Sequence, residues 1–251
     1  MKNIDIQTLK PKPGQGVYVF QFPVRLWHWT IVCCIFTLFI TGHFIGKPPQ
    51  TLQGDPTRLF YFGLLIKAHY TAGLILCVAM LCRILYAFVG NSVSRQIFIP
   101  HIWQKSWWDG FFDSIKWYLF INKNPGICMG HNPLAQAAMW LVVMALIFMC
   151  LSGLGIYQAK GYSSLLKGFS FMENLAYSAG GNGMNLVVWH RLGMVIVVIF
   201  VMAHIYMVIR EDIMGRTTII STMISGTRLV KATPLEDWHD LQQEEAHIKH
   251  E

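Results

Sequence analysis

The sequence predicts an all-α membrane protein whose four transmembrane helices form a bundle, with one further amphipathic helix at the membrane interface. Three observations predict this fold. Of the 251 residues, 54% are hydrophobic and only 13% are charged, about half the charged share of an ordinary soluble domain. Four apolar runs are long enough to cross a bilayer as helices. One connection between the runs mixes aromatic with charged residues at helical spacing.

The four apolar runs are expected to form the membrane spans. Glycines and prolines cluster between the runs, as in GKPPQTLQGDP and SAGGNGMN, which is typical of loops. The third run begins at Pro133, which suits the first turn of a helix because the N–H that proline lacks would be unpaired there anyway. The expected spans are residues 28–45, 63–89, 133–157 and 186–209.

The distribution of Lys and Arg predicts the orientation of the chain. Most of the 20 basic residues fall in the two terminal segments and in the connection between the second and third spans. The positive-inside rule therefore places both termini on the inner, cytoplasmic side of the membrane. We expect residues 1–17 to form an N-terminal tail, residues 18–226 the membrane domain, and residues 227–251 a polar C-terminal tail.

The connection between the second and third spans contains WQKSWWDGFFDSIKWYLF. Its tryptophans and phenylalanines recur at helical spacing among Lys and Asp, which favours a helix lying in the interface with its aromatic rings at headgroup level. The net charge of +7 is also concentrated at the ends of the apolar runs. This placement favours contact with anionic lipid over a nucleic-acid partner.

The six cysteines show no CxxC or CxxCH pattern. An iron–sulfur site, a zinc site and covalently attached haem are therefore not supported by the sequence. Any redox cofactor held by the chain must use other ligands, which directs attention to the histidines.

Histidine at membrane depth is costly and usually functional. His190 and His204 both lie in the fourth run, 14 residues apart. Fourteen residues bring a helix to within about 40° of a whole number of turns and raise it by about 21 Å, so both rings project from a similar face, one near each membrane surface. Two haems, one in each leaflet, would need this arrangement on a shared helix.

Each haem iron would need a second imidazole at the same depth. His69 lies near the outer end of the second run and His28 at the inner start of the first. Depth alone therefore predicts two ligand pairs, His69 with His190 outside and His28 with His204 inside. The competing interpretation is that these histidines are hydrogen-bonded packing residues or a proton relay in an anchor or transporter without a cofactor.

Other polar residues at the run ends have candidate roles. Arg25 and Arg191 lie close to His28 and His190 and could contact haem propionates, although snorkelling to the interface is an equal alternative. His43 has no histidine left to pair with at its depth and is interpreted as interfacial, and His101 is expected to face solvent.

The segment GHNPLAQ begins the third run at the inner side. A quinone needs hydrogen-bond donors to its carbonyl oxygens and a source of protons. Gly130, His131 and Asn132 could line such a quinone pocket at the depth of the inner haem, and an ordinary helix cap is the alternative.

Several longer motifs resemble one known family. They include PVRLWHW (23–29), TGHFIGKP (41–48), AHYTAG (68–73), GHNPLAQAAM (130–139), WHRLGM (189–194) and HIYMVIREDIM (204–214). Together these motifs are similar to the b-type cytochrome subunit of membrane-bound nickel–iron hydrogenases, a family related to the cytochrome b subunit of formate dehydrogenase. The resemblance covers about residues 18–226.

This resemblance implies a four-helix cytochrome with two b haems, and by motif the ligands are again His28, His69, His190 and His204. It also implies periplasmic partners, namely the hydrogenase large subunit and a small subunit that adds a C-terminal membrane helix. Electrons from dihydrogen would pass through iron–sulfur clusters, the outer haem and the inner haem to ubiquinone or menaquinone. A formate dehydrogenase-like complex is the alternative assignment.

Overall fold

The structure is a computed structural model that describes residues 16–48, 60–90, 98, 102–122, 132–162, 165–180, 185–214 and 218–229. The proposed quinone residues Gly130 and His131, as well as His101, lie outside the described residues. The chain divides into two compact units. The bundle unit comprises Leu26–Pro100 and Ala135–Ala203, and the terminal unit comprises Met1–Arg25, His101–Leu134 and His204–Glu251.

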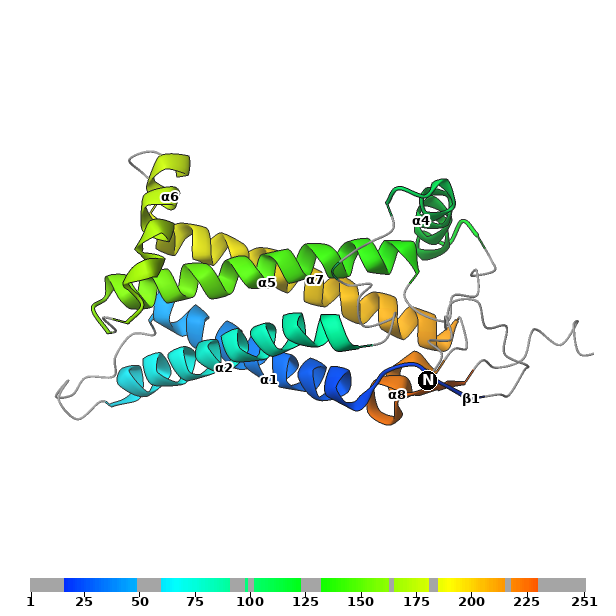
Figure 1. Ribbon diagram of the computed structural model, residues 1–251, viewed down its shortest axis with the longest axis horizontal. Helices are drawn as coiled ribbons and strands as arrows, with labels where there is room; N and C mark the ends of the chain where they lie inside the picture. Colours follow the sequence, from blue (N-terminus) through cyan, green and yellow to red (C-terminus); the bar gives the residue numbers. More distant parts are fainter. Residues whose placement is uncertain are drawn as a thin grey trace, which may run out of the picture. The chain divides into compact units, whose positions relative to one another are not determined.

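Four long helices confirm the predicted spans (Figure 1). Each is apolar enough and long enough to cross a membrane, and each extends the predicted run by one to six residues at one or both ends, apart from shared limits at Val89, Pro133 and Leu186. The residues that flank an apolar run can continue the helix because a helix satisfies its own backbone hydrogen bonds. The helices are α1 (Phe22–Gly46), α2 (Tyr61–Val89), α5 (Pro133–Ala159) and α7 (Leu186–Ile213).

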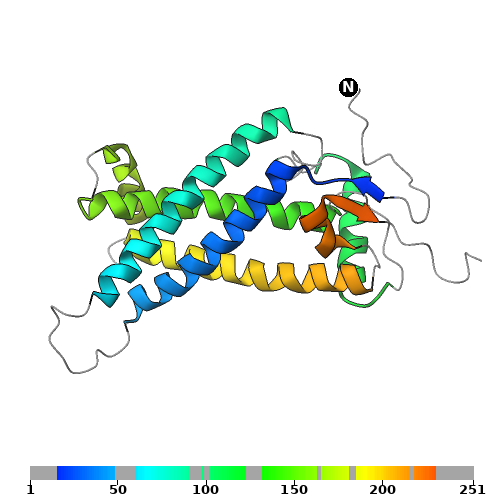
Figure 2. The ribbon, with the colours of Figure 1, turned by 90° about the horizontal axis from the view of Figure 1, so that it is seen from below.

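The core of the bundle unit draws on all four long helices, which lie side by side in both ribbon views (Figures 1 and 2). Large apolar side chains on the outer faces remain exposed, among them Phe36 at 66% and Ile199 at 61%. A soluble protein rarely exposes so much apolar surface, whereas lipid tails are a suitable solvent for it. The core residues are Ile31, Cys34, Leu76, Met80, Val142, Val143, Leu146 and Val197.

Two short elements between α5 and α7 also belong to the bundle unit. They are the 3-10 helix η3 (Lys167–Ser170) and the helix α6 (Phe171–Gly180). Met172 and Ala176 of α6 form a small core with Leu186 at the start of α7. The sequence analysis did not predict these elements, because ten residues of mixed polarity carry a weak helical signal.

The terminal unit contains the predicted amphipathic helix, α4 (Lys105–Tyr118). Its helical structure is confirmed, and Trp107 and Trp117 are its buried residues. The unit also contains α8 (Ile219–Ser225) and a two-stranded antiparallel ribbon (Figure 2). Strand β1 (Gly16–Tyr18) pairs with strand β2 (Thr227–Leu229), with Val17 opposite Arg228. The sequence analysis did not predict this ribbon, which joins the beginning and the end of the membrane domain.

Candidate functional site

A cavity of about 430 Å³ lies within the bundle unit between its four long helices. Its volume is within the range of small-molecule binding pockets. His69 of α2 and His190 of α7 both line it, together with Arg191. The structure therefore brings together the two histidines that depth analysis pairs at the outer side. Most other lining residues are apolar, among them Leu38, Leu76, Leu146, Met149, Met194 and Val197.

Each of these histidines is oriented by a hydroxyl group from a neighbouring helix. Thr41 Oγ1 of α1 lies 2.9 Å from His69 Nδ1, and Ser152 Oγ of α5 lies 2.7 Å from His190 Nδ1. Both hydroxyls are themselves buried, at 5% and 0% exposure. Each long helix thus contributes one residue to the two hydroxyl–imidazole pairs, and the two histidines of these pairs line the cavity.

The hydroxyl hydrogens determine which nitrogen of each imidazole carries the proton. Thr41 Oγ1 donates to the Thr37 carbonyl oxygen at 2.6 Å, and Ser152 Oγ donates to the Phe148 carbonyl oxygen at 2.7 Å. A hydroxyl has one hydrogen, so each oxygen can only accept from the imidazole. Nδ1 therefore carries the proton in both rings, and Nε2 keeps the lone pair that binds a metal.

A glycine follows each of the two hydroxyl residues and leaves room for the imidazole. A Cβ added at Gly42 would lie 3.1 Å from His69 Cε1, and one added at Gly153 would lie 3.4 Å from His190 Cε1. The dipeptides Thr41–Gly42 and Ser152–Gly153 therefore have the same role on α1 and α5: the first residue binds the ring and the second allows its close approach.

The two arginines proposed to contact propionates have different surroundings. Arg191 lines the cavity, and its Nη2 donates to the Gly46 carbonyl oxygen at 3.3 Å. Arg25 belongs to the terminal unit, where its Nη1 donates to the carbonyl oxygen of Ile224 in α8. The position of Arg191 suits a contact with a bound anionic group, and the role of Arg25 stays a prediction.

The remaining histidines are less informative. His43 is exposed and is not among the residues that line the cavity, in keeping with its interpretation as interfacial. His28 and His204 are both partly buried and lie in different units, His28 in the bundle unit and His204 in the terminal unit. Their pairing as inner ligands stays a prediction.

Asn132 is the one proposed quinone residue that the structure describes. Its Nδ2 donates to the hydroxyl oxygen of Tyr118, at the end of α4, at 3.2 Å. Sequence reasoning did not single out Tyr118, because a tyrosine at the end of an amphipathic helix is usually an interfacial anchor. The hydrogen bond connects Asn132, which directly precedes α5, with α4.

A cavity with two oriented imidazoles between four membrane helices can be compared with known families. The model of one family, described as prokaryotic cytochrome b561, matches residues 19–226. The chain belongs to this family.

Individual relatives are similar to the chain over most of their length. The probable Ni/Fe-hydrogenase 1 B-type cytochrome subunit of Escherichia coli (strain K12) is 46% identical over 211 residues, which cover 84% of the chain and 90% of the relative. The probable Ni/Fe-hydrogenase B-type cytochrome subunit of Bradyrhizobium diazoefficiens is 42% identical over 215 residues, 84% of the chain and 85% of the relative. Its counterpart in Azotobacter vinelandii is 38% identical over 226 residues, which cover 88% of the chain and 92% of the relative.

This cavity, called the outer cavity after the membrane side predicted for it, fits the haem b that a b-type cytochrome implies. Two neutral imidazoles with free Nε2 atoms are suitable axial ligands for iron. The glycines allow both rings to lie close to the neighbouring helices, the walls are largely apolar, and Arg191 is available for a propionate. The residues that would hold the group are therefore His69 and His190, with Thr41 and Ser152 orienting them.

The hydroxyls predict a measurable effect on the outer haem. Replacing Thr41 with valine, or Ser152 with alanine, is expected to raise the midpoint potential of this haem by about 40 mV, the one-electron equivalent of ~1 kcal/mol for one hydrogen bond. A hydrogen bond from Nδ1 makes the imidazole a better donor and so favours ferric iron. Redox titration followed by absorbance measures the shift.

Thr30→Val is the matched control for this prediction. Thr30 Oγ1 makes the same type of bond, to the Leu26 carbonyl oxygen at 2.9 Å, within the same helix, but it lies about three turns away from Thr41, whose hydroxyl contacts His69. The control should leave the potential of the outer haem unchanged. A shift in Thr30→Val as large as in Thr41→Val would contradict the assigned role of Thr41.

Proposed function

We propose that the chain is the haem b electron-transfer and membrane-anchor subunit of a hydrogen:quinone oxidoreductase. The observation that carries the proposal is the pair of hydroxyl-oriented histidines, His69 and His190, at one membrane cavity. Histidines that only contribute to packing would share one cavity in the same orientation only by chance. Two rings whose Nδ1 atoms contact hydroxyl groups, so that Nε2 is left to bind iron, suit a haem. The names of the relatives supply the partner.

The proposed assembly follows from these assignments. The large and small subunits of a nickel–iron hydrogenase would dock on the periplasmic side, and the small subunit would add a C-terminal membrane helix. Both termini of the chain would lie in the cytoplasm. A second haem would be held by His28 and His204, and ubiquinone or menaquinone would be reduced near Gly130, His131 and Asn132.

The role of the chain's own residues is positional. Bound haem b would supply one-electron redox chemistry. The four histidines would set the number and position of the iron sites, and the apolar walls of the outer cavity would exclude water and help to set the potential. Hydrogen activation would belong to the partner subunits, because the chain contains no CxxC motif.

A spectrum of the complex under dihydrogen tests the proposal. The purified complex should show a reduced-minus-oxidised difference spectrum of b-type haem with two haems per chain, and dihydrogen alone should produce the reduced form. Added quinone should then reoxidise the haem. A well-folded chain without haem absorbance would exclude the cytochrome function, and haem that dihydrogen does not reduce would exclude the hydrogenase partner.

A further inference from the structure

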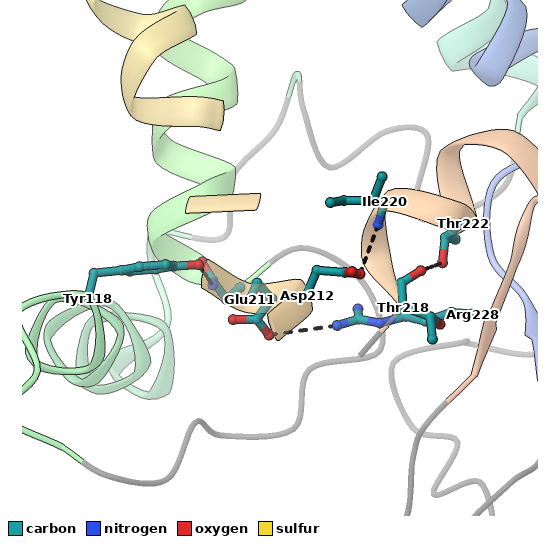
Figure 3. A network of polar contacts seen from close by, with 8 residues as sticks. Tyr118, Glu211, Asp212, Thr218, Ile220, Thr222 and Arg228 are labelled. Atoms are coloured by element: carbon teal, nitrogen blue, oxygen red, sulfur yellow. Dashed lines mark hydrogen bonds and ion pairs between the residues drawn. The ribbon is translucent and has the colours of Figure 1, made fainter. Parts of the chain in front are cut away.

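A group of buried ionisable side chains lies in the terminal unit, at the end of α7, and the haem sites do not use it (Figure 3). Glu211 of α7 and Arg228 of β2 form an ion pair, with Oε1 and Nη2 3.8 Å apart and side-chain exposures of 13% and 6%. A buried ion pair contributes little to stability compared with apolar packing and is often retained for another purpose. Glu211 keeps a small contact with solvent.

Tyr118 of α4 lies on the other side of this carboxylate. Figure 3 shows its ring directed toward the turn of α7 that carries Glu211. Burial, and next the negative charge of Glu211, raise the pKa of the Tyr118 phenol. The hydroxyl therefore stays protonated at neutral pH, and Glu211 is close enough to influence it.

The hydrogen bond from Asn132 leaves the proton of Tyr118 available. The Tyr118 oxygen accepts from Asn132 Nδ2, and a phenol that accepts one hydrogen bond still has its own O–H to donate. Asn132 belongs to the segment proposed to hold the quinone. Tyr118 thus lies between a partly exposed carboxylate and Asn132, the described residue of the proposed quinone site.

The end of α4 is held firmly against α7. Arg210 donates to the Trp117 carbonyl oxygen, and its guanidinium lies over the rings of Trp117 at 4.5 Å and Phe120 at 3.6 Å. Phe120 adopts φ of 63°, a conformation that surrounding contacts must stabilise in a non-glycine residue. Tyr206 also donates to the Tyr118 carbonyl oxygen at 3.1 Å. Among the described residues, Arg210, Arg228 and Tyr118 are ionisable groups that interact electrostatically with Glu211.

We infer that Glu211 and Tyr118 form the proton-delivery pair for quinone reduction beside Asn132. The inference rests on the proposed function. The quinone takes up two electrons, which the cytochrome supplies, and two protons. For each proton, the O–H bond of Tyr118 breaks as an O–H bond forms on a quinone oxygen. The carboxylate of Glu211 then takes a proton from water and passes it to the phenolate, which restores the phenol and returns Glu211 to its ionised form. General acids placed in this way commonly accelerate a proton-coupled step by about 100-fold or more.

The test is a stopped-flow experiment on the intact hydrogenase complex. Dihydrogen first reduces the haems, and decylubiquinone or menadione is then added while haem reoxidation is followed. In Glu211→Gln we expect normal haem content, normal reduction by dihydrogen and reoxidation slowed by roughly 100-fold. Glu211→Asp, which keeps a carboxyl group, should recover most of the rate. Tyr118→Phe should also slow reoxidation, and it removes only one oxygen.

Two controls separate proton delivery from a structural role. Arg228→Gln breaks the ion pair but keeps the carboxylate, so its reoxidation rate should stay close to that of the wild type. Glu173→Gln changes an exposed glutamate of α6 and should have no effect. Equal slowing in Arg228→Gln and Glu211→Gln would show that the ion pair is only structural, and normal rates in both Glu211→Gln and Tyr118→Phe would overturn the inference.

The wild-type trace distinguishes this inference from the proposed function. If wild-type haem is not reduced by dihydrogen or not reoxidised by quinone, the proposed function fails. If the wild type behaves as expected and the variants behave like it, only the proton-delivery pair is wrong.

Discussion

Replacing His190 with alanine is expected to halve the haem content of the purified protein while the chain still inserts into the membrane. His190 lines the outer cavity, and its Nδ1 is engaged by Ser152, so Nε2 is the atom left to bind iron. Without it the outer haem would keep a single axial ligand and be lost during purification. His69→Ala should give the same loss, because the two residues serve one iron. Haem extracted and quantified against protein measures both variants.

His43→Ala is the matched control for the outer ligands. His43 lies on α1 near its outer end but is exposed and does not line the cavity, so its removal should leave the haem content unchanged. Added imidazole should restore part of the haem in His190→Ala, since it can occupy the vacated space. Full haem content in both His69→Ala and His190→Ala would rule out the outer ligand pair.

The inner ligand pair leads to the second large effect. Either His28→Ala or His204→Ala is expected to remove the other haem, again halving the haem content. The double variant should lose no more than either single variant, because both histidines are predicted to bind one iron. The His190→Ala and His204→Ala combination, in contrast, should abolish haem binding altogether. The absorbance spectra of the four variants, normalised to protein, provide the measurement.

The inner variants should also separate two steps of electron transfer. With the inner haem absent, dihydrogen should still reduce the remaining haem in the complex, but quinone should reoxidise it very slowly. Reoxidation at the wild-type rate in His28→Ala would contradict a quinone site on the inner side. If the variant that combines His28→Ala with His204→Ala lost all haem, His28 and His204 would have to bind different irons.

The four spans could be predicted because an apolar run of this length rarely forms any structure other than a transmembrane helix. The pairing of His69 with His190 at one level could also be predicted, since helical rise converts spacing into depth. The helix Lys105–Tyr118 was recognisable from its aromatic residues. The spans and this helix rest on patterns that repeat over many residues, so a single unusual residue does not obscure them.

The hydroxyl and glycine residues of the site were missed. Thr41 and Ser152 are small polar residues within apolar helices. The hydroxyl group of such a residue usually forms a hydrogen bond only with the backbone of its own helix. The repeated hydroxyl–glycine dipeptide in two spans was the available signal. The ribbon of β1 and β2 could not be predicted, because two strands of three residues from distant parts of the chain have no measurable alternation.

The origin of Thr41, His69, Ser152 and His190 in four different helices has a consequence for biogenesis. A ribosome delivers Thr41 first and His190 last, so the pocket is complete only after the final span has entered the bilayer. Cofactor capture is then a late event that closes the bundle and joins its earliest and latest segments.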